Sequence, residues 1–259
     1  MSGLDELLSL AEEGALRAGE TLMEHFIGPA SGVDHKTTET DLVSDADRAA
    51  ESFLLDFISS KRPQDGVFAE EGGRENSESG LTWVVDPLDG TINFLFRIPH
   101  WCVSVGVEDE NGGVVGVIRN PNLDETFRAA RDGGATLNSE PIRVSERREL
   151  ATALIGTGFA YDSEARRVQA EQVSRILPRA RDIRRAGSAA LDLAFLACGR
   201  LDGFYEASME RWDKSAGVLI ATEAGATITE LPPPKEGLSP GVIGANEVLH
   251  RALVELLLA

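Results

Sequence analysis

Two aspartates lie three residues apart where a strand-like run of the chain ends. The segment at residues 82–91 reads TWVVDPLDGT. Asp86 and Asp89 can direct carboxylate oxygens to one side of a turn, where the Leu88 carbonyl is exposed and Gly90 lets an anion approach the backbone. Hard oxygen ligands of this kind suit a divalent cation that holds a phosphate. The alternative is an ordinary turn, because Asp-Pro and Asp-Gly are common wherever a chain reverses.

Further acids at the ends of expected elements favour the metal site. Glu70 follows an expected strand at residues 66–69, and Asp213 opens an expected helix. Read singly, the glutamate fits an exposed loop and the aspartate fits a helix N-cap. A phosphatase with two metals about 3.5–4 Å apart needs several oxygen ligands to polarise a phosphoryl group and generate hydroxide. Combined with Asp86 and Asp89, the two acids predict this chemistry.

The elements that must position these acids follow from local patterns. Apolar residues at helical spacing predict a helix over residues 4–26, and a second helix is expected over residues 44–61. Strands are expected at residues 66–69, 82–85, 102–108, 113–120 and 125–130. Later strands are expected at 154–158, 182–185, 202–206 and 227–231, with helices over 163–177, 188–198, 213–225 and 246–258. This succession predicts an α/β (α+β) fold.

The polar stretch at residues 133–144 marks the change from the strand-rich part to the alternating part. We therefore expect an N-terminal α+β half, residues 1–140, that carries most metal ligands. The C-terminal α/β half, residues 141–259, carries Asp213 and substrate contacts.

Composition restricts the class of protein. The 259 residues are 42% hydrophobic, enough for a sizeable core, and 25 basic against 43 acidic residues give a net charge of -18. This balance argues against direct nucleic-acid binding by phosphate neutralisation, and the acidic run at residues 108–110 is expected to be solvated. No stretch approaches the roughly 20 apolar residues that span a bilayer, so we expect a cytoplasmic protein without membrane contact. Cys102 and Cys198 lack metal or redox spacing and are expected to be buried free thiols.

Taken in order, the motifs resemble the inositol monophosphatase family. The resemblance rests on EE at residues 70–71, WVVDPLDGTINF at 83–94, and WD followed by SAG at 212–217. Between them, RRAGSAALDLA at residues 184–194 and GRLDGFYE at 199–206 resemble the bacterial and archaeal branches. The match spans nearly the whole chain. It implies a layered αβαβα sandwich of the sugar phosphatase type and a homodimer.

The resemblance also implies roles for individual residues. It implies that two or three Mg²⁺ ions per site are bound by Glu70, Asp86, Asp89, Asp213 and the carbonyl of Leu88. The implied catalytic residues are Glu70, Thr91 and Asp47, of which the last two orient and deprotonate the attacking water. The implied substrate-binding residues are Gly90, Thr91, Gly187, Ser188, Glu206 and Asp213. In this set the amides of Gly90 and Thr91 receive the phosphate, and Glu206 accepts hydrogen bonds from sugar-like hydroxyls.

A segment before the second helix completes the resemblance. Lys36, Asp41 and Ser44 match a family segment that forms a mobile hairpin over the active site in relatives. The alternative is a solvated loop before a helix that Ser44 caps.

The implied reaction is hydrolysis of a polyol or sugar monophosphate, with inositol 1-phosphate as first choice, by metal-activated water and without a phospho-enzyme. Fructose 1,6-bisphosphate or another small phosphate ester stays open as the substrate. A second phosphate would need cations, for which Arg166, Arg167, Arg184 and Arg185 are candidates, although surface charge also accounts for them. Lys214 and Glu210 depart from the usual family pattern and could alter the substrate rim.

A function of another class also stays open. Some bacterial relatives join RNA polymerase antitermination assemblies, so the resemblance admits a transcription partner in place of an enzyme. The full carboxylate set favours the enzyme, because a pure scaffold has no need of such an arrangement.

Overall fold

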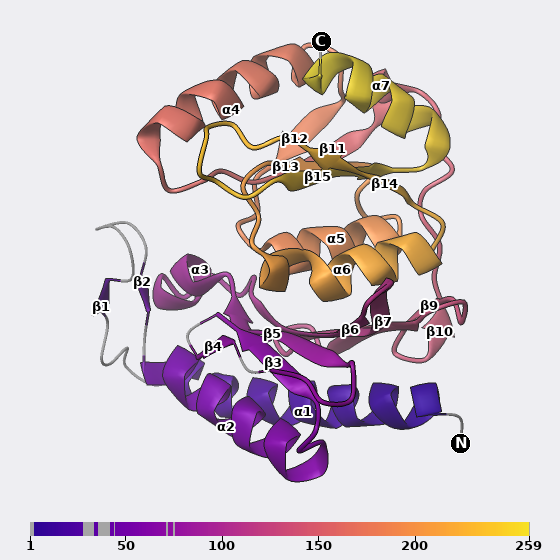
Figure 1. Ribbon diagram of the computed structural model, residues 1–259. Helices are drawn as coiled ribbons and strands as arrows, with labels where there is room; N and C mark the ends of the chain where they lie inside the picture. The colour runs from indigo at the N-terminus through magenta and orange to yellow at the C-terminus, as the bar shows by residue number, and fades with distance from the viewer. Residues whose placement is uncertain are drawn as a thin grey trace.

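The computed structural model describes residues 3–27, 34–35, 42–43, 45–70, 72–74 and 76–258. Helices and sheets alternate in five layers, as Figure 1 shows. The outer helices on one side are α1 (Gly3–Ile27) and α2 (Asp45–Lys61). The helices between the two sheets are α5 (Ala189–Ala197) and α6 (Arg211–Glu223), and those on the far side are α4 (Ser163–Ile176) and α7 (Glu247–Leu257). The predicted αβαβα arrangement is confirmed.

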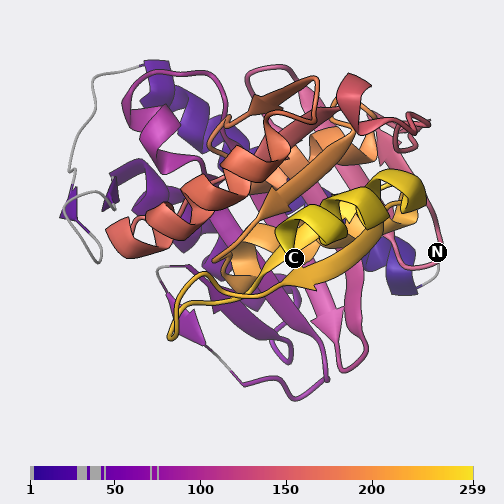
Figure 2. The same ribbon diagram turned by 90° about the horizontal axis from the view of Figure 1, so that it is seen from above.

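The two sheets differ in pattern. In spatial order the eight-stranded sheet contains β10 (Glu140–Pro141), β9 (Ala135–Leu137), β8 (Glu125–Ala130), β7 (Gly112–Asn120), β6 (Cys102–Asp109), β5 (Thr82–Asp89), β3 (Gly66–Ala69) and β4 (Gly73–Arg74). The five-stranded sheet contains β12 (Asp182–Arg184), β11 (Leu154–Thr157), β13 (Gly203–Glu206), β15 (Gly241–Ala245) and β14 (Thr227–Leu231). The first is antiparallel except where β3 pairs with β5, and the second is mixed. Seen from above in Figure 2, α4 and α7 cross the same side of the five-stranded sheet.

The described chain also contains shorter elements, among them a 3-10 helix at Leu150–Thr152. The helix α3 (Thr91–Leu95) follows β5, while β1 (Asp34–His35) pairs antiparallel with β2 (Leu42–Val43). No helix in the described part of the chain is both long and apolar enough to cross a bilayer.

The structure corrects two expectations about strands. β5 continues to Asp89 instead of ending at residue 85, with a register shift between Asp86, opposite Ser104, and Asp89, opposite Cys102. A bulge there accommodates Pro87, which has no N–H to give to the ladder. The stretch at residues 133–144, expected to be a polar link, contains β9 and β10.

Separate hydrophobic clusters fill the spaces between the layers. One cluster fills the space between α1, α2 and the eight-stranded sheet, and another lies between the five-stranded sheet and α4 and α7. The middle cluster joins Ile118 and Phe127 of the first sheet to Leu193 and Ile220 of α5 and α6. Side chains from both sides of residue 140 therefore share one core, and a domain boundary at that residue stays a prediction. Cys102 is buried as expected, but Cys198 is only half-buried.

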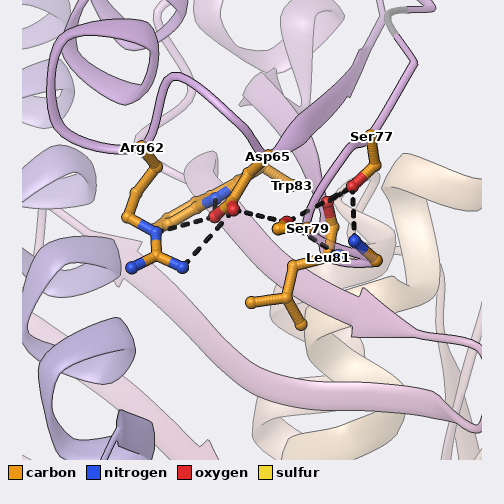
Figure 3. A network of polar contacts seen from close by, with 7 residues as sticks. Arg62, Asp65, Ser77, Ser79, Leu81 and Trp83 are labelled. Atoms are coloured by element: carbon orange, nitrogen blue, oxygen red, sulfur yellow. Dashed lines mark hydrogen bonds and ion pairs between the residues drawn. The ribbon is translucent and has the colours of Figure 1, made fainter.

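A buried carboxylate fixes the loop that leads into β5. The Asp65 side chain is 1% exposed and accepts hydrogen bonds from Arg62 Nε at 2.8 Å, Ser79 Oγ at 2.6 Å and Trp83 Nε1 at 2.9 Å (Figure 3). Burial alone would raise the pKa of Asp65, but these hydrogen bonds outweigh it and lower the pKa below its usual value. The network joins the end of α2 to the strand that carries Asp86.

Replacing Asp65 with Ala should lower the free energy of unfolding by about 2–4 kcal/mol, because the buried indole N–H of Trp83 loses its acceptor and the bonds from Arg62 and Ser79 are lost. Urea denaturation at pH 7 measures this. Since the folded pKa is depressed, the stabilisation is present above the unfolded pKa of about 4 and is lost as the pH falls through the folded pKa. The difference between the two proteins should therefore shrink on acidification.

The matched control is Glu171→Ala. Glu171 also pairs with an arginine, Arg167, but its side chain is 55% exposed and lies in α4, where alanine is well tolerated. Surface ion pairs of this kind contribute at most about 1 kcal/mol. Equal destabilisation by the two substitutions would contradict a structural role for the buried network.

Candidate active site

Asp86 and Asp89 lie at the end of β5 and are 2% and 8% exposed. The side chain of Asp86 accepts a hydrogen bond from the Leu88 amide at 3.0 Å. This bond closes a local turn at the bulge. Gly90 follows with φ of 97°, a left-handed conformation that favours glycine, and α3 begins at the next residue. The sequence DPLDGT thus presents two carboxylates and a helix start within one turn of chain.

The N-terminus of α5 holds the Asp89 carboxylate. Its Oδ2 accepts hydrogen bonds from Ser188 Oγ at 2.5 Å and from the Ala190 amide at 2.8 Å, and its Oδ1 accepts one from the Ala189 amide at 3.3 Å. Burial raises the pKa of Asp89, while these donors oppose the rise. The hydroxyl of Ser188, which is predicted to contact substrate, donates a hydrogen bond to Asp89. Its contact with substrate stays a prediction.

Asp213 lies in the first turn of α6, where its Oδ2 accepts the Glu210 amide at 2.7 Å. Glu108 of β6 braces this turn on both sides of Asp213. It accepts hydrogen bonds from Arg211 Nε at 2.8 Å and from Ser215 Oγ at 2.6 Å. The expectation that Glu108 is solvated is wrong, because its side chain is 17% exposed and holds α6 in place.

Two paired glycines allow α6 to approach the sheet closely. A Cβ at Gly106 would lie 2.3 Å from Ser215 Oγ, and one at Gly116, its partner on β7, would lie 2.8 Å from the Ala216 carbonyl oxygen. The Trp212 ring packs 5.3 Å from the Phe68 ring of β3. These contacts place Asp213 beside the ends of β3 and β5.

The resulting cluster unites acids from three elements. Asp86, Asp89 and Asp213 each offer a carboxylate oxygen, and the three oxygens lie within 4.8 Å of one another. Glu70 directly follows β3, whose last residue, Ala69, pairs with Val85 immediately before Asp86. Burial raises the pKa of Asp213 well above its usual value, and the charges of Asp89 and Glu70 raise it further. The structure therefore places near one another all four acids that the sequence singled out.

The chemistry of this donor set fits a hard divalent cation. Like charges close together repel unless a cation compensates them. Burial raises the pKa of both Asp89 and Asp213, and the charges of Asp89 and Glu70 raise the pKa of Asp213 further. All the grouped donors are carboxylate oxygens, which suit Mg²⁺ or Mn²⁺ better than zinc or copper. The Leu88 carbonyl oxygen, a further predicted ligand, lies 3.1 Å from Thr91 Oγ1, whose single proton can be donated either to it or to Asp47.

Thr91 and Asp47 meet across the site. Thr91 Oγ1 lies 3.2 Å from Asp47 Oδ1, although the two residues are 44 positions apart in the chain. Asp47 belongs to the first turn of α2 and is 2% exposed. The pair predicted to orient and deprotonate water is thus in hydrogen-bond contact, and its catalytic role stays a prediction.

Glu206 ends β13 of the five-stranded sheet. A Cβ at Gly158 would lie 2.1 Å from its carboxylate, so only glycine leaves room for Glu206 at this position. Burial raises the pKa of Glu206 to about 8, with further contributions from the charges of Asp192 and Asp89, while Arg185 opposes the rise. The charge of Asp89, a proposed metal ligand, therefore acts on Glu206 as it does on Asp213.

Gly187 precedes α5 with φ of 93°, and a Cβ there would lie 2.7 Å from Arg185 Nη1. The side chain of Asn93 in α3 donates to the carbonyls of His100 at 2.7 Å and Ala186 at 2.9 Å. These bonds join the segment after β5 to the segment before α5. No local pattern predicts these hydrogen bonds of Asn93, because the Ala186 carbonyl lies 93 residues away in the chain.

The four arginines proposed to meet a second phosphate differ in position. Arg166 donates to the Ala160 carbonyl, Arg167 pairs with Glu171, and Arg184 pairs with Asp182, all at exposed sites. Among the four, only Arg185 opposes the rise in the pKa values of Asp192 and Glu206.

Other predicted residues lie outside the described cluster. Lys214 Nζ donates to the carbonyls of Met209 and Pro240, and Glu210 accepts the Ser239 hydroxyl, so both hold the segment at residues 232–240. A role for them at the substrate rim stays a prediction. Lys36, Asp41 and Ser44 lie outside the described residues.

The five layers and the carboxylates gathered at the ends of β5 and α6 define a phosphatase fold of the sugar phosphatase type. The family model described as "Inositol monophosphatase family" matches residues 3–259. The chain belongs to the inositol monophosphatase family.

Several characterised relatives and structures are similar over almost all of the chain. The inositol-1-monophosphatase of Synechocystis sp. is 38% identical over 265 residues, covering 100% of this chain and 91% of that protein. The Nus factor SuhB of Escherichia coli K12 is 36% identical over 226 residues, covering 86% and 85%. The structure of inositol monophosphatase from Anabaena (Nostoc) sp. superposes with a TM-score of 0.86 at 36% identity, covering 99% of this chain and 97% of that one.

Proposed function

We propose that this member of the family is a Mg²⁺-dependent phosphatase of polyol or sugar monophosphates, with inositol 1-phosphate as the first candidate substrate. The observation that carries the proposal is the triad of Asp86, Asp89 and the half-buried Asp213, whose oxygens lie within 4.8 Å of one another. Glu70 and the Leu88 carbonyl complete the proposed ligand set for two or three ions. Similarity to proteins named inositol-1-monophosphatase supports the choice of substrate.

The chain's own groups suit direct hydrolysis. When bound, divalent cations would supply positive charge to the phosphoryl oxygens and lower the pKa of a water. Asp47 accepts the Thr91 hydroxyl hydrogen bond, which leaves the Thr91 oxygen lone pairs to receive a water proton. The amides of Gly90 and Thr91 at the start of α3 would donate to the phosphate, with Gly187 and Ser188 facing it from α5. Glu70 assists the same water in this proposal.

The surroundings of Glu206 favour hydroxyls over a second phosphate. Asp192, which is buried, and Glu206, which is half-buried, are both influenced by the charge of Arg185, so two acidic groups share this cation. Carboxylate oxygens accept hydrogen bonds from hydroxyls but repel phosphate. This balance supports a monophosphate with free hydroxyls over fructose 1,6-bisphosphate.

A panel of phosphate esters tests the proposal, with released phosphate measured in Mg²⁺ and in EDTA. We expect turnover only with the metal, and a higher kcat/KM for inositol 1-phosphate than for fructose 1,6-bisphosphate. Glu206→Gln should lower kcat/KM for inositol 1-phosphate roughly 10-fold or more, because hydrogen bonds to charged groups contribute about 1.5–3 kcal/mol. Turnover of p-nitrophenyl phosphate, which lacks the hydroxyls, should change little. A higher efficiency on fructose 1,6-bisphosphate would overturn the choice of substrate.

Similarity to proteins named Nus factor SuhB favours a second candidate function, binding to the transcription machinery. Pull-down with purified transcription factors, run beside the phosphatase assay, separates the two functions. Tight binding without any Mg²⁺-dependent turnover would reverse their order.

A cytoplasmic homodimer remains part of the proposal. Light scattering on the purified protein measures the oligomeric state, and a monomer at micromolar concentration would contradict a stable dimer.

A further inference from the structure

The hydroxyl of Ser104 is buried without a hydrogen-bond partner among the described residues. Ser104 is 1% exposed, and its Oγ atom is inaccessible to solvent. Burying an unpaired hydroxyl costs about 1–3 kcal/mol, and native structures contain few such groups. Alanine at position 104 would avoid this cost, so the presence of a serine there needs a physical reason.

Ser104 lies on β6, directly opposite one acid of the cluster. It is the cross-strand partner of Asp86 in the β5–β6 ladder, and directly opposite side chains on antiparallel strands lie about 4.5–5.5 Å apart at Cβ. Its neighbours on the same face of β6 are Cys102 and Gly106. Cys102 Sγ contacts Asp89 Oδ2 at 3.7 Å, and Gly106 lies against Ser215, two residues after Asp213. Ser104 therefore shares a face of the sheet with Asp86 and has neighbours on β6 that contact Asp89 and the first turn of α6.

Its position distinguishes Ser104 from the other buried polar atoms that lack partners. Those atoms belong to His100, Trp101, Asn120, Asn122, Thr157 and Tyr205. Thr157 and Tyr205 are paired with each other in the β11–β13 ladder. Among these side chains in the described part of the chain, only Ser104 is paired with an acid of the cluster.

We propose that Ser104 is a positioning residue for the metal site: its hydroxyl, which has no partner among the described residues, donates to the Asp86 carboxylate when a cation is bound and holds that carboxylate in the orientation that binds the cation. The inference rests on the proposed function, because it requires the metal site. Asp86 already accepts the Leu88 amide from its own strand. A donor on β6 would fix the same carboxylate from a second strand. Groups that orient metal ligands in this way commonly change metal affinity about 10–100-fold when removed.

The test is isothermal titration of Mn²⁺ alone into the full-length protein, together with thermal melting in EDTA. Ser104→Ala should weaken Mn²⁺ binding about 10–100-fold. Its melting temperature in EDTA should equal or exceed that of the wild type, because an unpaired buried hydroxyl is removed. A residue with a merely structural role would not show this opposite movement of affinity and stability.

Two further variants sharpen the test. Ser104→Thr keeps the hydroxyl and should restore most of the affinity. Tyr205→Phe removes another unpaired buried hydroxyl, on β13, and should leave the dissociation constant unchanged. Equal Mn²⁺ affinity in Ser104→Ala and wild type would overturn the inference alone. If the wild type bound no Mn²⁺, the proposed metal site itself would fail.

Discussion

Replacing Asp89 with Asn should abolish metal-dependent phosphate release while the protein stays folded. Asp89 supplies one of three carboxylate oxygens within 4.8 Å, and its loss should remove several kcal/mol of charge stabilisation from the transition state. At 1.36 kcal/mol per factor of ten, this corresponds to a fall in kcat of about 10³-fold or more. The measurement is phosphate release at saturating Mg²⁺, with Mn²⁺ titration to follow the lost affinity.

The same substitution should not destabilise the metal-free protein through its charge. The Asp89 carboxylate raises the pKa of Asp213, Asp192 and Glu206, so removing that charge relieves repulsion among buried acids. The Asn oxygen can still accept an amide hydrogen bond from the start of α5. We expect a melting temperature in EDTA close to or above that of the wild type.

Asp132→Asn is the matched control for Asp89→Asn. Asp132 is exposed in a turn with φ of 60°, a conformation that Asn also tolerates well. Its activity should match that of the wild type. Retained Mg²⁺-dependent turnover in Asp89→Asn would contradict the assignment of Asp89 as a metal ligand.

Asp47→Asn should lower kcat about 10²–10⁴-fold and leave Mn²⁺ affinity near the wild-type value, because general base catalysis contributes about this much. Asp47 Oδ1 lies 3.2 Å from Thr91 Oγ1, and an amide at this position can orient the hydroxyl but cannot take up a proton. Steady-state kinetics and metal titration on the same preparation separate the two effects.

Asp45→Asn provides the comparison on the same helix. Asp45 and Asp47 both lie in the first turn of α2, so both interact favourably with the helix dipole, but Asp45 is exposed and pairs with Arg48. Its kcat should stay within about twofold of the wild type. Equal losses in the two variants would indicate a general effect on α2 and would count against a role for the Asp47–Thr91 pair.

The sequence predicted the helices well because their signal is local. The expected helix at residues 4–26 corresponds to α1 (Gly3–Ile27), and the one at residues 163–177 corresponds to α4 (Ser163–Ile176). Apolar spacing and capping residues lie within each segment. Asn246, for example, caps α7 by accepting the amides of Val248 and Leu249.

Several strands had no comparable signal. β15 (Gly241–Ala245) reads GVIGA, with two glycines that disfavour strands, yet all five residues are buried between β13 and β14. Pairing on both sides determines this strand, and such partners are not visible in a local pattern. For the same reason, the local pattern at residues 133–144 predicts a polar link although the stretch contains β9 and β10.

The acids of the site were predictable because DPLDGT and the Trp-Asp pair are contiguous motifs. The contacts that position these acids were not predictable from the sequence. Glu108 braces α6 through Arg211 and Ser215, more than 100 residues away in sequence, and Asn93 reaches the Ala186 carbonyl 93 residues away. Ser104 resembles any small residue of a buried strand until the register places it opposite Asp86.

Anomalous diffraction from crystals grown with Mn²⁺ and inorganic phosphate tests the central claim most directly. We expect metal peaks bounded by the oxygens of Asp86, Asp89 and Asp213, with Glu70 also coordinating and the phosphate near Gly90 and Thr91. Ordered Mn²⁺ bound elsewhere, with these carboxylates left without a cation, would contradict the account.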